Sequence, residues 1–102
     1  MTNTICNPLD LPYRFQVRDW AELCLREAAD PSVVFYRDRY WLFASKSGGY
    51  FHSADLRSWV FVPTRVLPTE DYAPDVRVIN GAIWFTASRS DQACPLYRSH
   101  DP

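Results

Sequence analysis

The sequence has little of what marks several common classes of protein. Its three cysteines, Cys6, Cys24 and Cys94, are odd in number and show no CxxC or Cys/His spacing. Neither a zinc site nor a disulfide framework is therefore expected, and we predict reduced thiols. Lysine is almost absent: Lys46 accompanies ten arginines that form no run, and the net charge is −1. This scatter predicts no nucleic-acid partner and no binding to an anionic membrane.

Long apolar segments are also missing. No segment is long enough to span a membrane, and residues 1–11 lack the basic start and apolar stretch of a secretory signal. If Met1 is the natural start, a cytoplasmic protein is expected. No metal or other cofactor is expected either. By contrast, 47% of the 102 residues are hydrophobic and 16% are aromatic, which predicts a chain that can bury more surface than it can cover alone.

One stretch of the sequence occurs twice. The two copies begin 43 residues apart, and their identical residues pair as Pro31 with Pro74, Val33 with Val76, Trp41 with Trp84, and Ser45 with Ser88. The offset then grows to 46, where residues 50–55 match residues 96–101. The first copy continues through Trp59 to residue 62, whereas the second stops at Pro102, before a counterpart of Trp59.

A repeat of this length, made of short aromatic strands, predicts an all-β protein built from β-propeller blades. One blade cannot bury both of its faces, so about three or more must stack. We expect a leader at residues 1–26, a first blade at 27–71 and an incomplete second blade at 72–102. Strands are predicted at residues 13–17, 33–36, 40–45, 50–53, 59–62, 76–79, 83–88 and 96–99. Residues 19–27 fit a helical turn or a strand, and Asn80-Gly81 predicts a hairpin turn.

Asp30 is the first candidate functional residue, because it directly precedes an apolar strand. An acid at the start of an innermost blade strand would face the central channel of a propeller. The alternative is a structural aspartate that begins a turn, as aspartates commonly do. Asp75 and Tyr72 lie near the same place in the second copy, where a carboxylate and an aromatic ring suit sugar binding. A second turn at the start of a blade is the alternative for them.

Other residues are predicted to be structural. Trp41, Trp59 and Trp84 are expected in the core, because large aromatic side chains dominate packing between sheets. Neither His52 nor His100 lies near another residue of a metal-binding type at a spacing that would form a metal site. The Ser-x-Asp strings at 53–55 and 99–101 cannot form a catalytic triad, since neighbouring strand residues point to opposite faces. Capping of a turn is the expected role of these strings.

These motifs together resemble glycoside hydrolase family 43, whose members are five-bladed propellers acting on arabinose- and xylose-containing glycans. The resemblance rests on residues 27–33 (Glu-Ala-Ala-Asp-Pro-Ser-Val), 40–45, 49–59 and 72–76 (Tyr-Ala-Pro-Asp-Val). It runs from about residue 7 to residue 102. The family often has tryptophan where Tyr72 stands, so the stacking contact here would be smaller and would carry a hydroxyl.

The resemblance implies an inverting glycosidase with Asp30 as the general base, and with Tyr72 and Asp75 in the substrate-binding pocket. Inversion needs a second carboxyl as general acid. In the family, the acid and a pKa-tuning aspartate come from later blades, so both are expected beyond Pro102. The chain alone is then expected to be inactive, and its partner is an oligosaccharide or polysaccharide.

Two other hypotheses stay open. The first is a carbohydrate-binding propeller without catalysis, because a fold alone does not fix function. The second is a small β-protein that closes by self-association, since an incomplete blade leaves an open strand edge and exposed aromatic side chains.

Overall fold

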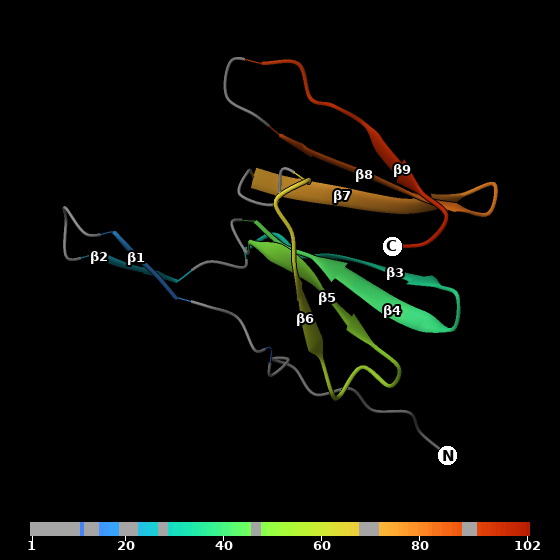
Figure 1. Ribbon diagram of the computed structural model, residues 1–102, viewed down its shortest axis with the longest axis horizontal. Coiled ribbons are helices and arrows are strands. Elements are labelled where there is room, and N and C mark those ends of the chain that lie inside the picture. The colour runs from blue at the N-terminus through green and yellow to red at the C-terminus, as the bar shows by residue number, and fades with distance from the viewer. Residues whose placement is uncertain are drawn as a thin grey trace.

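The described part of the chain is entirely β-structure. The computed structural model describes residues 11, 15–18, 23–26, 29–45, 48–67, 72–88 and 92–102, of which residues 15–18, 23–26 and 72 are described by their backbone alone. These residues form nine strands in three antiparallel sheets (Figure 1). The described segments include no helix that could cross a membrane. The all-β prediction is confirmed.

The smallest sheet is a hairpin of two strands, which Figure 1 shows projecting from the rest of the molecule. Strand β1 (Phe15–Arg18) pairs with β2 (Leu23–Arg26), with Phe15 opposite Arg26 and Arg18 opposite Leu23. Of the two alternatives for residues 19–27, residues 23–26 therefore take the strand. The rest of the predicted leader lies mostly outside the described residues, and the bounds of the three predicted segments stay predictions.

The first sheet is a four-stranded meander, β3-β4-β5-β6. Its strands are β3 (Ser32–Tyr36), β4 (Arg39–Phe43), β5 (Gly49–Ser53) and β6 (Val60–Pro63). They agree with the predicted strands to within one or two residues at each end. Between β3 and β4, Arg37 and Asp38 both have positive φ, 50° and 57°. Two such residues in succession match the twist of a tight hairpin.

The second sheet repeats the first three strands of that meander, in the order β7-β8-β9. It contains β7 (Tyr72–Ile79), β8 (Ala82–Ser88) and β9 (Tyr97–Ser99). The turn predicted at Asn80-Gly81 is confirmed, with φ of 49° and 72°. β7 begins four residues before the predicted strand, and its pairing shifts between Tyr72 and Asp75. Pro74 lies at this shift, on an edge strand, where a missing N–H is tolerated.

The two sheets keep the same register at the offsets of the sequence repeat. Trp41 lies opposite His52 in the first sheet, and Trp84 lies opposite Arg98 in the second. Each indole N–H also donates to the carbonyl five residues earlier: Trp41 to Tyr36 at 2.9 Å and Trp84 to Ile79 at 3.3 Å. The two copies of the sequence repeat therefore share the same strand register, and they also share this side-chain hydrogen bond.

One face of the first sheet packs on one face of the second, and we call the apolar cluster between them the inter-sheet core. Phe43 and Phe85 meet at its centre, with ring centroids 4.9 Å apart. Its buried members come from both sheets: Tyr36, Trp41, Phe43, Val76, Ile83, Phe85 and Ala87. Figure 1 shows β3 and β7 as facing strands of the two sheets. This core fixes the relative position of the two copies.

Polar groups join both ends of β3 to the second sheet. At one end the backbone N–H of Val76 donates to Ser32 Oγ at 3.1 Å. At the other end, Tyr36 Oη lies 2.9 Å from the carbonyl oxygen of Gly81 and 2.8 Å from that of His100. The two strands therefore run in the same direction, and both begin at the same edge of the molecule.

The opposite face of the first sheet carries a second apolar group, which we call the outer cluster. Its buried members are Leu42, Ala44, Phe51 and Trp59, and Leu11, Tyr40, Leu56 and Phe61 pack against them. Trp41 and Trp59 are buried, 7% and 8% exposed, as predicted. Trp84 is only half-buried, so the prediction of a core position is wrong for this residue. The guanidinium of Arg98 lies over its ring, 5.5 Å from the centroid.

The corresponding faces of the two sheets differ in polarity. The face of the first sheet that meets the second carries Ser32, Val34 and Phe43. At the same places of the repeat, the second sheet carries Asp75, Arg77 and Thr86. Asp75 and Arg77 are exposed. The second sheet is thus apolar toward the first sheet, and on its other side charged residues stand beside Trp84, which lies opposite Arg77.

Candidate functional site

Asp30 lies two residues before β3, at the edge of the molecule where β3 and β7 begin. It is exposed and its φ is 49°, a left-handed conformation that aspartate adopts more readily than most residues. No hydrogen bond within the described part of the chain engages its carboxylate. A carboxylate presented in this way can accept a hydrogen bond from water.

Ser45 fixes the backbone beside Asp30. Its N–H donates to the carbonyl of Ala29 at 2.8 Å, and its Oγ accepts from the N–H of Ala73 at 3.0 Å. Ser45 itself is only 2% exposed, whereas its partners Ala29 and Ala73 are exposed. One buried serine therefore holds together the residue before Asp30 and the start of the second sheet. The sequence repeat marked Ser45 as a shared residue but gave no sign of this role.

Tyr72, a predicted sugar contact, opens β7 and pairs with Ser88 across the second sheet. The next residue, Ala73, is the one that Ser45 ties to the segment beside Asp30. The backbone therefore brings residues 72–73 to the same edge as Asp30. The side chain of Tyr72 lies outside the described ones, so its proposed stacking contact stays a prediction.

Asp75, the other predicted sugar contact, lies on the polar face of the second sheet. Its neighbours Pro74 and Val76 are buried, and successive strand residues point to opposite faces. Its carboxylate accepts from Arg77 Nε at 3.1 and 3.3 Å, in an exposed ion pair. Asp75 is the repeat counterpart of Ser32, whereas Ala73 is the counterpart of Asp30. The structure thus separates Asp75 from the face on which the two sheets meet.

The Ser-x-Asp strings have the capping role that the sequence predicted. Ser53 Oγ accepts from the N–H groups of Asp55 and Leu56, at 3.2 and 2.8 Å, and donates to Asp55 Oδ1. The same Oδ1 accepts from the N–H groups of Ser58 and Arg57, at 2.9 and 2.8 Å. The pKa of Asp55 is held below its ordinary value mainly by the bond from the Ser58 N–H, and next by the bond from the Arg57 N–H. This turn has no arrangement for nucleophilic catalysis.

The histidines are also structural. Nδ1 of His52 lies 3.3 Å from Arg39 Nη1, and its ring packs beside Trp41 with centroids 5.4 Å apart. Burial, followed by the Arg39 charge, lowers the pKa of His52, which disfavours the charged imidazolium. His100 Nδ1 lies 3.3 Å from the carbonyl oxygen of Gly81. Among the described residues, no group of three or more His, Cys, Asp or Glu could hold a metal ion.

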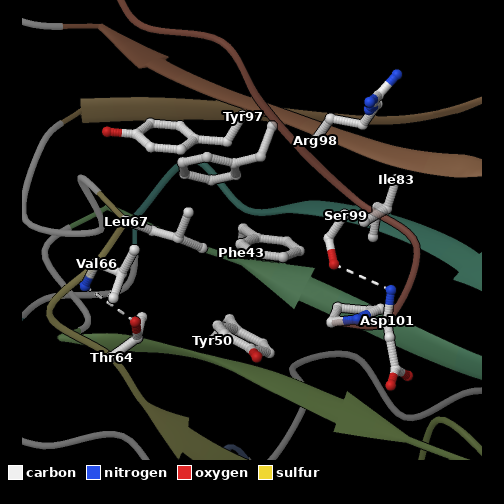
Figure 2. A pocket seen from close by; sticks show the side chains of 12 residues that line it. Phe43, Tyr50, Thr64, Val66, Leu67, Ile83, Tyr97, Arg98, Ser99 and Asp101 are labelled. Atoms are coloured by element: carbon white, nitrogen blue, oxygen red, sulfur yellow. Dashed lines mark hydrogen bonds between the residues drawn. The ribbon is translucent and has the colours of Figure 1, made fainter.

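A cavity of about 300 Å³ lies between the two sheets, away from Asp30. Figure 2 shows aromatic rings from both sheets around it. The lining residues are Phe43, Tyr50, Thr64, Val66, Leu67, Ile83, Phe85, Tyr97, Arg98, Ser99, Asp101 and Pro102. The lining includes none of the three predicted site residues, Asp30, Tyr72 and Asp75. The cavity and the candidate catalytic edge are therefore separate features.

Sheet order, register and packing define this protein as two consecutive blades of a β-propeller. No protein-family model and no curated protein matches the chain. Among solved structures, the crystal structure of a thermostable family-43 glycoside hydrolase is similar, with a TM-score of 0.57 at 18% sequence identity. The match covers 96% of this chain and 33% of that one, so the chain spans about a third of the length of that structure. The likeness confirms the propeller fold.

Proposed function

We propose that this chain is the part of an inverting glycoside hydrolase that supplies the general base, and that Asp30 is that base. The substrates would be glycans that contain arabinose or xylose. The observation that carries the proposal is the placement of Asp30, an exposed carboxylate on a backbone that the buried Ser45 holds in place. The likeness to a family-43 glycoside hydrolase supports the same reading.

The geometry suits the task of a general base. In an inverting glycosidase, one carboxylate removes a proton from water while the water attacks the sugar carbon, and a separate acid protonates the leaving oxygen. The carboxylate of the base must therefore be able to contact a water molecule, and it must not already be engaged in an ion pair within the protein. Asp30 meets this condition among the described residues, whereas Asp55 and Asp75 are engaged by other groups of the chain.

The residues of the second blade are proposed to contact the sugar. Tyr72 would offer an aromatic face, and its backbone already lies at the edge that carries Asp30. Asp75 would accept hydrogen bonds from sugar hydroxyls, for which its exposure leaves room. The general acid is proposed to come from another part of the full propeller, so residues 1–102 alone would not turn over substrate.

The test joins residues 1–102 to the remaining two thirds of the family-43 structure, in place of its matching third. Hydrolysis of 4-nitrophenyl arabinofuranoside and xyloside is measured for the fusion and for residues 1–102 alone. We expect turnover by the fusion only. Asp30→Asn in the fusion should lower kcat by about 10²–10⁴-fold, the range for loss of a general base.

Asp38→Asn is the matched control. Asp38 is also an exposed aspartate with positive φ, but it lies at the opposite end of the β3–β4 hairpin. Its substitution should leave kcat unchanged. Turnover by residues 1–102 alone, or a folded fusion whose rate ignores Asp30→Asn, would refute the proposal. Sugar binding without turnover would favour the carbohydrate-binding alternative.

A further inference from the structure

The site of the proposed reaction is divided between the two sheets. Asp30 precedes β3 of the first sheet, and Tyr72 opens β7 of the second. A water molecule activated at Asp30 attacks a sugar held at Tyr72 only if the two segments keep a fixed spacing. A displacement of about 1 Å can cost about 10²-fold in rate. The group that sets this spacing is therefore part of the catalytic design.

Ser45 contacts both segments, and it does so through different atoms. Its N–H donates to the carbonyl oxygen of Ala29 at 2.8 Å, and its Oγ accepts from the N–H of Ala73 at 3.0 Å. The carbonyl of Ala29 belongs to the planar peptide group that leads into Asp30. The N–H of Ala73 belongs to the planar peptide group that follows Tyr72. One residue thus orients a peptide group beside each of the two proposed site residues.

The repeat distinguishes these two contacts of Ser45. At the offset of 43, Ala29 corresponds to Tyr72. Ser45 corresponds to Ser88, and Ser88 pairs with Tyr72 across the second sheet. The backbone contact therefore belongs to the framework that each sheet has within itself. The hydroxyl contact crosses from the first sheet to the second, and it joins the two places where the proposed site residues lie.

We infer that Ser45 is a positioning residue, whose hydroxyl sets the spacing between the general base Asp30 and the sugar contact Tyr72. The inference rests on the function proposed above for these two residues. Ser45 is 2% exposed, so it lies below the surface that a sugar would touch. It acts on the reaction through the two peptide groups that it holds.

The two sheets keep other contacts when this hydroxyl is removed. The N–H of Val76 donates to Ser32 Oγ at 3.1 Å. Phe43 and Phe85 pack at the centre of the inter-sheet core. Loss of the Ser45 hydroxyl therefore releases the start of β7 and leaves the packing of the sheets in place. A variant at this position can then separate a positioning role from loss of the fold.

The first test uses the fusion protein described for the proposed function. Ser45→Ala should lower kcat by about 10–10²-fold, because the sugar is no longer held in line with the base. The loss should fall on kcat more than on KM, since the groups that bind the sugar are all retained. Circular dichroism verifies that the variant is folded. If Ser45→Ala does not fold, Ser45→Cys keeps a side chain of similar shape with a weaker acceptor, and a loss in kcat is again expected.

Ser53→Ala is the matched control. Ser53 is also 2% exposed, and its Oγ also accepts from backbone N–H groups. It pairs with Tyr40, near the β3–β4 turn and thus at the opposite end of the first sheet from Asp30. Its substitution should lower stability, as that of Ser45 does, but leave kcat unchanged.

A second test asks whether Ser45 acts through Tyr72. Substitutions of residues that work as one unit have effects that do not add. In a fusion that already carries Tyr72→Ala, the further change Ser45→Ala should therefore lower kcat much less than it does alone. A serine with a purely structural role would give independent losses.

The outcomes separate this inference from the proposed function. If Asp30→Asn lowers kcat and Ser45→Ala does not, the positioning role is overturned and the proposed function stands. Equal losses in Ser45→Ala and Ser53→Ala, or additive losses in Ser45→Ala and Tyr72→Ala, also overturn it. A folded fusion without turnover, or one whose rate ignores Asp30→Asn, overturns both, because there is then no reaction at Asp30 to position.

Discussion

Asp30 and Ala73 occupy the same place in the two copies of the repeat and have the same left-handed backbone, with φ of 49° and 46°. Only Asp30 carries a carboxylate. An alanine in this conformation costs about 1–2 kcal/mol, so the local geometry is retained in the second copy without a chemical group that needs it. Ser45 contacts the backbone at both places, which makes this serine the link between the shared geometry and the single acid.

Ser45→Ala should destabilise the protein by about 0.5–1.5 kcal/mol, because the N–H of Ala73 loses its acceptor. Urea unfolding measures the loss. Ser58→Ala is the matched control, since Ser58 is exposed and bonds through its backbone N–H. Equal stability of the two variants would show that the Ser45 hydroxyl does not hold the two blades together.

Tyr36→Phe should cost more stability than Arg37→Gln. The Tyr36 hydroxyl reaches two backbone carbonyls of the second sheet, and loss of such a bond is worth about 0.5–1.5 kcal/mol. Arg37 pairs with Asp101 at 3.1 Å, but the side chains are 56% and 88% exposed, so the median worth of about 0–1 kcal/mol applies. In 0.5 M salt, the Arg37→Gln effect should shrink and the Tyr36→Phe effect should persist. The opposite order would contradict the assigned role of the Tyr36 hydroxyl.

Gly49→Ala should destabilise the first sheet. A Cβ at Gly49 would collide with the backbone carbonyl of Val62 and would lie 2.7 Å from the ring of Phe61. Overpacking of this kind costs about 1–3 kcal/mol. Gly81→Asn is the control, because Gly81 has open space around it and a φ of 72°, which asparagine tolerates. Thermal melting should separate the two variants clearly, and a neutral Gly49→Ala would refute the close contact.

Acid should remove the contribution of Asp55 to stability. Its depressed pKa means that the folded state favours the ionised carboxylate, so this contribution is present above the ordinary pKa of 3.8 and is lost as the pH falls through the lower folded value. The difference in unfolding free energy between the natural protein and Asp55→Asn should therefore shrink below pH 3.8. Urea unfolding at pH 7 and at two values below 3.8 tests this. A difference that stays constant with pH would contradict it.

The repeat made much of the fold predictable. Once Trp41 and Trp84 are aligned, the offsets predict which residues face each other across the strands, and the register agrees. Asn80-Gly81 predicted its turn because few residues accept two successive positive φ values. Residues 19–27 were ambiguous because so short a segment cannot separate a strand from a helical turn by periodicity. The structure assigns residues 23–26 to a strand through their pairing with β1.

The candidate site was less predictable. The position of Asp30 follows from its place before a strand, but its left-handed backbone has no sequence signature. The bond from Ala73 to Ser45 joins residues 28 apart, and the one from Val76 to Ser32 joins residues 44 apart. Such contacts depend on how the sheets pack, which local patterns do not encode. The length of β7 was missed for a similar reason, because Pro74 argues against a strand unless the strand lies at an edge.

The contrast in polarity between corresponding faces of the two sheets also bears on folding. Proteins made of similar units are prone to assemble them out of order, with one unit docking where another belongs. A sheet that packs on this face of the first sheet contacts Val34 and Phe43. A sheet that packed on the corresponding face of the second sheet would contact Arg77 and Thr86 instead. Burying Arg77 together with its ion-pair partner Asp75 would remove two charges from water, which is costly. The sequence difference between the repeats thus distinguishes the corresponding faces of the two sheets. It disfavours misassembly in which one sheet docks in the place of the other.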